Sequence, residues 1–202
     1  MQTKQFIFDI GNVLVNFDFN EFLQRVATDS NQPVKPLTLR DLEMHHAVEK
    51  GHISDQEFVD YINQTEGLNW TLDELIGVWR KMFTLNETGY GLLRKAIQSG
   101  VPVYTLSNIA EHHIQAIVRN FPGLFDGVTR MFLSYQIGSR KPEAEIYSHL
   151  LNALRVDGSY SLFLDDLADN VSAARAAGIA AYQFIPENYE SICTMMETSF
   201  GK

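Results

Sequence analysis

Short apolar runs alternate with segments of helical periodicity at the start of the chain and again from about residue 86 onward. The apolar runs predict β-strands, and the segments between them predict amphipathic helices. The expected strands are 6–8, 101–106, 128–133, 161–165 and 180–184, and the expected helices are 92–98, 111–120, 143–154 and 170–177. Pro142 occupies a favoured first-turn position for helix 143–154. Repeated strand–helix units predict an α/β fold, a doubly wound parallel sheet with helices on both faces.

Residues 17–85 have a different pattern, in which helix-start signals replace the short apolar runs. At the start of a helix, an N-cap side chain is often followed three residues later by an acidic side chain that accepts a hydrogen bond from the N-cap backbone N–H. Four such pairs occur, of which the last two match the capping-box pattern: Asp18 and Glu21, Thr38 and Asp41, Ser54 and Glu57, Thr71 and Glu74. Apolar residues recur at helical spacing behind these pairs. The sequence therefore predicts an all-α helical bundle at 17–85, inserted into a core made of 1–16 and 86–202.

The overall composition narrows the classes of function. A chain of 202 residues with 45% hydrophobic residues can bury one sizeable core with a small accessory unit. A formal charge of −9 argues against general nucleic-acid binding, which needs clustered Lys and Arg. No apolar stretch approaches the length of a membrane span, so we expect a cytoplasmic protein without a membrane partner. The single cysteine, Cys193, indicates no internal disulfide, and the sequence leaves the oligomeric state open.

Three of the expected strands end in polar residues. Asp9 follows the first strand, Ser107 and Asn108 follow 101–106, and Asp165 and Asp166 close 161–165. Ligands of doubly wound sheets gather outside the carboxyl ends of the strands, so these side chains are candidates for one site. Taken singly, each has an ordinary explanation as a turn or cap residue. Their occurrence together favours a functional site.

Four fragments then stand in a fixed order along the chain: FDIGNV at 8–13, LSN at 106–108, SRKPE at 139–143 and FLDD at 163–166. In order and spacing they resemble the four motifs of the haloacid dehalogenase (HAD) superfamily, which includes many Mg-dependent phosphatases. The resemblance covers nearly the whole chain. It implies a Rossmann-like HAD core, and it implies that the helical insert is a cap that influences substrate choice.

The resemblance also implies a role for each fragment. Asp9 would attack phosphorus and form an aspartyl phosphate, which divides a difficult hydrolysis into two easier steps. Lys141 would hold Asp9 and the transferring phosphoryl group, and the Ser107 hydroxyl and the Asn108 backbone N–H would bind phosphate oxygens. The full set of residues expected at the phosphate is Ser107, Asn108, Lys141, Gly11 and Asn12.

A carboxylate that approaches a phosphate dianion needs positive charge beside it, which predicts a hard cation with oxygen ligands. The expected cofactor is Mg²⁺. By the resemblance its ligands would be Asp9, the backbone carbonyl of Gly11, and the last acidic pair. Asp166 is the better candidate of that pair, and Asp165 would be a close or water-mediated ligand. The expected partner is a small phosphorylated metabolite.

The first motif departs from the usual phosphatase pattern, because Gly11 stands where a second aspartate normally serves as acid and base. General acid–base help is worth about 10²- to 10⁴-fold. A sugar 1-phosphate suits such a site, since its anomeric hydroxyl is a better leaving group than an ordinary alcohol. Alternatively, Asp18, His45, His46 or ordered water could supply the missing group.

The wording of the motifs resembles the bacterial α-D-glucose-1-phosphate phosphatase branch of the superfamily, whose members also carry this glycine. Sugar phosphates, α-D-glucose 1-phosphate among them, therefore lead the expected substrates, with Trp79 and Arg80 as cap residues that could touch them. Two alternatives stay open. One is a catalytically weakened, phosphate-binding regulatory protein. The other is a hydrolase for a different bond, in a haloacid or in a phosphonate, the latter with Lys50 or Lys81 as an imine-forming lysine.

Overall fold

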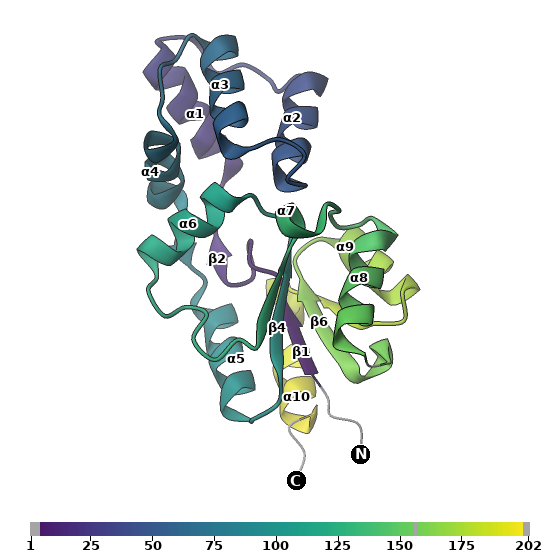
Figure 1. Ribbon diagram of the computed structural model, residues 1–202. Coiled ribbons are helices and arrows are strands. Elements are labelled where there is room, and N and C mark those ends of the chain that lie inside the picture. Colours follow the sequence, from purple (N-terminus) through teal and green to yellow (C-terminus); the bar gives the residue numbers. More distant parts are fainter. Residues whose placement is uncertain (1–4, 156, 200–202) are drawn as a thin grey trace.

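The computed structural model describes residues 5–155 and 157–199 and contains one sheet of five parallel strands (Figure 1). The spatial order is β5-β4-β1-β6-β7. These strands are β1 (Gln5–Phe8), β4 (Val103–Ser107), β5 (Arg130–Leu133), β6 (Ser161–Asp165) and β7 (Ala180–Gln183). The predicted doubly wound α/β architecture is confirmed. In the register of the sheet, Phe8 lies opposite Thr105 on one side and Leu164 on the other. The three central strands therefore end at one rim.

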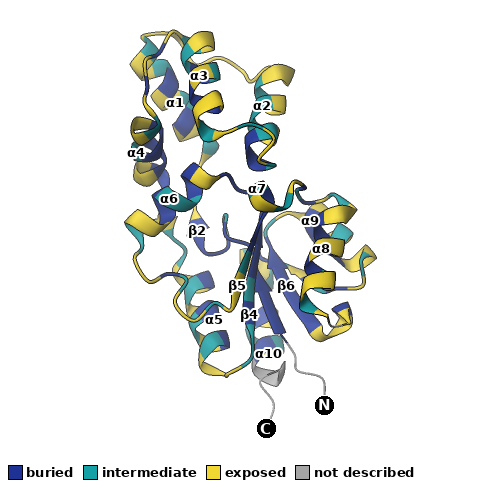
Figure 2. Ribbon diagram, in the orientation of Figure 1, coloured by how far each residue is buried: buried dark blue, intermediate teal, exposed yellow. Residues whose placement is uncertain are grey.

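Successive side chains of β1 point to opposite faces of the sheet, so the hydrophobic core has one part on each face. Phe6 and Phe8 join one apolar cluster, which includes Leu93 and Ile192, whereas Ile7 joins the other cluster. The first face is covered by α5 (Glu87–Gln98), α6 (Glu111–Asn120) and α10 (Tyr189–Ser199), and the second by α8 (Ala144–Leu154) and α9 (Ala168–Ala176). Figure 2 shows the central strands β4, β1 and β6 mostly buried, with exposed residues on the helices around them. Three short helices complete the core: α7 (Ser134–Ile137), η1 (Gly158–Tyr160) and η2 (Pro186–Asn188).

Several element boundaries differ from the sequence-based expectations. Helix α5 begins at Glu87 rather than at 92, because the Asn86 side chain caps it by accepting a hydrogen bond from Gly89 N. Helix α8 begins at Ala144, so the placement of Pro142 in its first turn was wrong. Instead, Pro142 belongs to a loop in which Glu143 N donates to Arg140 O at 2.8 Å. Helices α7 and α10 were not predicted.

Four helices lie between β1 and α5 and form the insert at the top of Figure 1: α1 (Phe19–Ser30), α2 (Leu39–Glu49), α3 (Asp55–Glu66) and α4 (Leu72–Met82). The predicted capping boxes at Ser54 and Thr71 are confirmed, and Thr38 with Asp41 forms a third. The chain enters and leaves the insert through β2 (Val15–Asn16) and β3 (Thr84–Leu85), which pair in an antiparallel ribbon.

The helical insert packs directly on the core. Helix α4 contacts α6, and charged pairs link the insert to the core at four places among the described residues. The linked atoms are Asp55 Oδ1 and His112 Nδ1 at 2.7 Å, Glu49 Oε2 and Arg140 Nε at 3.0 Å, Lys50 Nζ and Glu143 Oε1 at 2.5 Å, and Asp73 Oδ1 and Arg119 Nη1 at 3.4 Å. Among the helices of the described residues, none has the length and apolar character that crossing a bilayer requires. A cytoplasmic location stays a prediction from the sequence.

Candidate active site

Asp9 lies at the point where β1 ends, at the rim shared with β4 and β6. Its backbone N–H donates to Leu164 O at 2.8 Å, and its Oδ1 accepts from Ile10 N at 2.6 Å. The residue is only 6% exposed. Its other carboxylate oxygen, Oδ2, lies 2.9 Å from Lys141 Nζ. The side chain is thus held by the loop that follows the strand and by one buried cation.

Lys141 is fixed at both its backbone and its side chain. The Asn108 side chain accepts from Lys141 N at 2.7 Å and donates to Lys141 O at 2.8 Å. The ammonium group bridges Asp9 and Asp165, with Nζ 2.5 Å from Asp165 Oδ2. Burial by itself would lower the pKa of Lys141, but the two carboxylates outweigh it and raise the pKa above the usual value. Lys141 is therefore a permanent buried cation, and Asn108 positions it.

The two aspartates that end β6 have different partners. Asp165 Oδ1 accepts from Leu167 N at 2.9 Å and from the Asn170 side chain at 3.0 Å, while its Oδ2 contacts Lys141. Asp166 Oδ2 accepts from the Asn12 side chain at 3.1 Å. Asn12 has a left-handed backbone, with φ of 52°, which turns its side chain across the rim. Asp165 is fully engaged by protein donors, and Asp166 is the more available of the pair.

Three carboxylates meet at this rim. Asp9, Asp165 and Asp166 each place one oxygen within 4.8 Å of the others. Burial is the main cause that raises the pKa of Asp9 to about 7, and the neighbouring carboxylates add to it while Lys141 opposes it. Burial also raises the pKa of Asp166. Clustered, desolvated carboxylate oxygens are the donor set that a hard divalent cation prefers, and such a cation would favour their ionised forms. The residues therefore fit Mg²⁺.

A small cavity of about 60 Å³, the rim cavity, lies above the rim. Three of the five residues expected at the phosphate line it, namely Gly11, Ser107 and Asn108, whereas Asn12 and Lys141 lie outside its lining. Aromatic side chains of the insert also line it, together with His113 of the core: Phe17, Phe19, His45, Trp79 and Phe83. A Cβ at position 11 would lie 3.0 Å from the Phe17 ring. The ring edge thus occupies space that a second aspartate would need.

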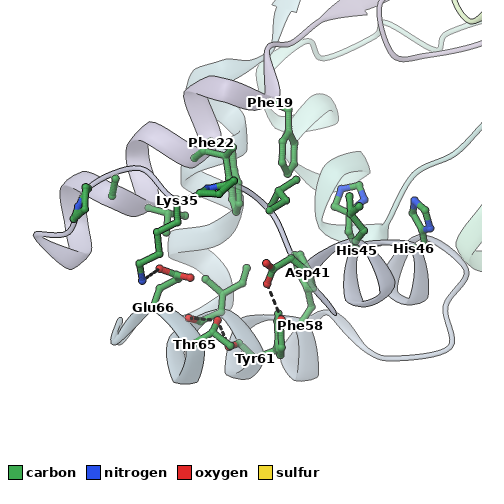
Figure 3. Close-up of a pocket in the computed structure, with 18 of the residues that line it drawn as sticks. Phe19, Phe22, Lys35, Asp41, His45, His46, Phe58, Tyr61, Thr65 and Glu66 are labelled. Atoms are coloured by element: carbon green, nitrogen blue, oxygen red, sulfur yellow. Dashed lines mark hydrogen bonds and ion pairs between the residues drawn. The ribbon is translucent and has the colours of Figure 1, made fainter. Parts of the chain in front are cut away.

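A larger cavity of about 300 Å³ lies inside the insert (Figure 3). Aromatic and aliphatic side chains make most of this cap cavity, for example Phe22, Val26, Phe58 and Ile62. Polar groups stand at its edges: Lys35 paired with Glu66 at 2.9 Å, Asp41 bonded to Tyr61 at 2.6 Å, and His45, His46 and Arg140. Among the described lining residues, Phe19 and His45 alone belong to both cavities, so they separate the two spaces.

The structure also places the insert residues that the sequence analysis left open. Trp79 lines the rim cavity and at the same time stacks on Phe22 with ring centroids 5.1 Å apart. Arg80 lines neither cavity and donates to the Asn120 side chain on the outer surface. Lys50 and Lys81 are likewise absent from both linings, and Asp18 caps α1 by accepting from Asn20 N.

Two residues near the site escaped the sequence analysis. Glu49 and His113 both line the rim cavity, yet Glu49 lies at the end of one helix and His113 in the first turn of another, far away in the chain. No motif connects them. The available signal was a polar residue at a helix position that faces the apolar core, where polar side chains are uncommon.

Comparison with known proteins agrees with this geometry. The chain is 29% identical over 201 residues to the sesquiterpene phosphatase astK of Aspergillus oryzae, an alignment that covers 96% of this chain and 94% of the relative. It is 29% identical over 204 residues to a D-ribitol-5-phosphate phosphatase of Bacteroides thetaiotaomicron, with 92% of each chain covered.

Solved structures resemble the fold closely. A HAD family enzyme from Bacteroides thetaiotaomicron superposes with a TM-score of 0.82 at 23% identity, covering 95% of this chain and 99% of that one. A mutant of that enzyme, in complex with magnesium and inorganic phosphate, gives a TM-score of 0.78 at 25% identity, covering 90% and 94%.

A doubly wound α/β core with an inserted helical bundle and an acidic, lysine-bearing rim defines the class of protein. The family model of the haloacid dehalogenase-like hydrolases matches residues 3–178. This chain belongs to that family, as its four motifs predicted.

Proposed function

We propose that the protein is a Mg-dependent phosphatase that hydrolyses small phosphomonoesters through an aspartyl-phosphate intermediate on Asp9. The contact of 2.9 Å between Asp9 Oδ2 and Lys141 Nζ, within a cluster of three carboxylates, is the observation that carries this proposal. A buried carboxylate with a cation beside it, next in the chain to residues that line a cavity at the rim, has the placement of a nucleophile. The named phosphatases among the relatives agree with it.

Each residue of the rim has a defined task in this reaction. Asp9 attacks phosphorus, and the bond from phosphorus to the alcohol oxygen breaks. Lys141 neutralises Asp9 and the transferring phosphoryl group, and Asn108 keeps Lys141 in place through two hydrogen bonds. Ser107 and the backbone at Gly11, Asn12 and Asn108 bind the phosphate oxygens. When bound, Mg²⁺ supplies positive charge that offsets the repulsion between carboxylate and phosphate.

The proposed ligands of Mg²⁺ are Asp9, the Gly11 carbonyl and Asp166. Asp165 is proposed to reach the ion only through water, because Lys141, Leu167 N and Asn170 already use both of its oxygens. Asn12 orients Asp166. These assignments refine the ligand set that the motifs implied.

Residues 17–85 are proposed to act as the cap and 1–16 with 86–202 as the catalytic core. The phosphate occupies the rim cavity in this arrangement, and the alcohol part of the ester reaches past Phe19 and His45 into the cap cavity. The antiparallel ribbon of β2 and β3 is then the connection about which a cap could move.

Sugar phosphates such as α-D-glucose 1-phosphate are the proposed substrates. Gly11 removes the usual acid, which favours a leaving group as acidic as an anomeric hydroxyl. The polar edges of the cap cavity offer hydroxyl partners, and its aromatic walls offer flat faces to a sugar ring. The ribitol phosphate specificity of one relative agrees with a polyol.

A second candidate substrate is the phosphate of an apolar alcohol. The mostly apolar lining of the cap cavity favours it, and astK, a sesquiterpene phosphatase, is a precedent among the relatives. Hydrolysis rates on glucose 1-phosphate, glucose 6-phosphate, ribitol 5-phosphate and farnesyl phosphate distinguish the candidates. Equal rates on the two glucose phosphates would remove the leaving-group argument.

The variant Asp9→Asn tests the function itself. It should lose Mg-dependent phosphate release from every substrate, because the nucleophile is gone. The matched control is Asp18→Asn, an exposed helix cap outside both cavities, which should keep its activity. Full activity of Asp9→Asn would refute the mechanism. A wild-type protein that binds phosphate but releases none from any ester would favour the regulatory alternative, and turnover of a phosphonate or a haloacid would favour the other bond chemistries.

A further inference from the structure

The reaction proposed above needs a general acid and base, and no residue has yet been assigned to that role. When the ester bond breaks, the alcohol oxygen needs a proton, and later the attacking water must lose one. Gly11 has no side chain to exchange it, and the ring of Phe17 lies 3.0 Å from where a Cβ would stand. The missing acid–base group must therefore come from another element that reaches the ester oxygen.

The two cavities indicate where that oxygen lies. With phosphorus in the rim cavity and the alcohol in the cap cavity, the bridging oxygen sits at their junction. Within the described part of the chain, Phe19 and His45 are the residues that line both spaces, and their rings meet edge to face with centroids 5.5 Å apart. His45 is the member of this pair that can carry a proton.

We propose that His45, from the cap helix α2, is the general acid and base of the reaction and replaces the aspartate absent at position 11. The inference rests on the proposed role of Asp9 as nucleophile. It assigns to the cap a catalytic task in addition to substrate selection.

The surroundings of His45 suit a group that changes protonation. Its Nδ1 lies 3.9 Å from Glu49 Oε2, one turn further along the same helix, which leaves Nε2 for a substrate. Burial is the main cause that lowers the pKa of His45, and Glu49 partly offsets it. The other charged or titratable groups that face it are Arg140, His112, His46 and His113. Burial thus favours the neutral imidazole, which can accept a proton from water. A phosphate dianion bound beside the ring favours the imidazolium form, which is the form that donates a proton in the first step.

His113 also lines the rim cavity, but its hydrogen bond fixes its tautomer and its neutral protonation state. Its Nδ1 accepts from Ala110 N at 3.2 Å, so the neutral ring carries its proton on Nε2. Protonation would break that bond inside a fully buried site, and the pKa of His113 lies well below its usual value because of burial. His113 can donate a hydrogen bond to a substrate oxygen, but it cannot accept a proton at Nε2.

The other two side chains that the sequence analysis offered for this role lie in the wrong place. His46 lines the cap cavity but not the rim cavity. Asp18 lines neither of them. In Figure 3, His45 stands near Phe19 and His46 lies beyond it, further from that ring.

The proposed proton movements balance over the cycle. Asp9 attacks phosphorus, the bond to the alcohol oxygen breaks with its electron pair on that oxygen, and imidazolium His45 gives the oxygen its proton. The products are the alcohol, the aspartyl phosphate and neutral His45. His45 then takes a proton from water, the hydroxide attacks phosphorus, and the bond to Asp9 breaks. Hydrogen phosphate leaves, and Asp9 is again a carboxylate beside imidazolium His45.

The experiment compares His45→Gln with His46→Gln, the adjacent residue on α2, in single-turnover assays with Mg²⁺. Alcohol release from glucose 6-phosphate should fall about 100-fold or more in His45→Gln, since its alkoxide needs a proton. Nitrophenol release from p-nitrophenyl phosphate should fall less than about tenfold, because nitrophenolate leaves unaided. With excess substrate, His45→Gln should show a burst of nitrophenol followed by slow phosphate release. His46 lines the cap cavity, so His46→Gln can change substrate binding, but the ratio of its rates on the two substrates should stay that of wild type.

If His45 had a purely structural role, His45→Gln would lower the rates on both substrates equally and show no burst. That result would overturn the proposal. Full activity of His45→Gln, or the same leaving-group pattern in His46→Gln, would also overturn it. As a second test, imidazole added to His45→Ala should restore glucose release, because the cap cavity of about 300 Å³ gives it access; absence of rescue in a folded variant counts against the proposal. A nitrophenol burst that survives Asp9→Asn would refute the proposed function instead.

Discussion

The ammonium nitrogen of Lys141 lies 2.5 Å from Asp165 Oδ2, and both side chains are completely buried. The same nitrogen contacts Asp9, so one cation connects the ends of β1 and β6 through side chains at the rim of the sheet. Buried charges of this kind are stable only as a group, because each lost partner leaves an uncompensated charge away from water.

Lys141→Gln should therefore lower the free energy of unfolding by about 3–5 kcal/mol and abolish turnover. Two buried carboxylates lose their counter-ion in this variant. The exposed pair of Lys35 with Glu66 provides the control, and Lys35→Gln should cost less than about 1 kcal/mol. Urea denaturation of the three proteins without Mg²⁺ measures the difference. Equal stability of both variants would contradict the view that Lys141 compensates buried charge.

The two aspartates at the end of β6 should respond differently to substitution. Asp166→Asn should weaken Mg²⁺ binding at least about tenfold with little loss of stability, because its protein partner is the Asn12 amide. Asp165→Asn should mainly destabilise the fold, since its oxygens hold Lys141, Leu167 N and Asn170. The shift of Tm with Mg²⁺ concentration reports the first effect, and Tm without metal reports the second. If Asp165→Asn weakened Mg²⁺ binding and Asp166→Asn mainly destabilised the fold, the roles proposed for the two aspartates would be the wrong way round.

The contribution of His113 to stability should fall below pH 6.5. Burial holds its folded pKa well below 6.5, whereas the unfolded chain takes up a proton near that value. The neutral ring therefore contributes stability above pH 6.5 that is lost as the pH falls, with a slope of up to about 1.4 kcal/mol per pH unit. Asp9 acts in the opposite sense, because its pKa is raised to about 7 and stability from its protonated form is lost as the pH rises.

His113→Asn isolates the histidine contribution, since Asn keeps an acceptor for Ala110 N and leaves Asp9 in place. Free energies of unfolding measured without Mg²⁺ between pH 7.5 and 5 should decline more steeply in wild type than in His113→Asn. Parallel curves of unfolding free energy against pH for the two proteins would show that His113 is not a buried neutral group in the folded protein.

Gly89 should tolerate no side chain. A Cβ there would lie 1.7 Å from Val13 O, in the loop that continues from Asp9, so Gly89→Ala forces backbone apart at a cost of about 2–3 kcal/mol. Gly91 lies on the same helix with nothing within 4 Å of its Cβ position, and Gly91→Ala should stabilise by about 0.5–1 kcal/mol. Thermal unfolding of the pair provides the comparison, and similar Tm values would show that the loop yields without cost.

Sequence patterns suffice to predict most of the elements and the residues at the rim of the sheet, although helices α7 and α10 escaped prediction. The five strands, the four helices of the insert and the clustering of Asp9, Lys141, Asp165 and Asp166 could all be predicted, because they depend on local periodicity, capping chemistry and motif order. Parallel strands then bring their carboxyl ends to one edge, whatever lies between them. The reach of α5 to Glu87 and the loop position of Pro142 escaped prediction, since a cap bond and a turn decide them.

Which residues of the insert reach the rim depends on the packing of helices that lie far apart in the chain. His45 and His46 are neighbours in sequence, yet only His45 lines both cavities, because successive residues on a helix point about 100° apart and packing selects one direction. Glu49, His113 and Phe19 meet there from three different helices. Such meetings depend on the packing of the insert against the core, which is set by contacts between distant segments and leaves no local pattern in the chain.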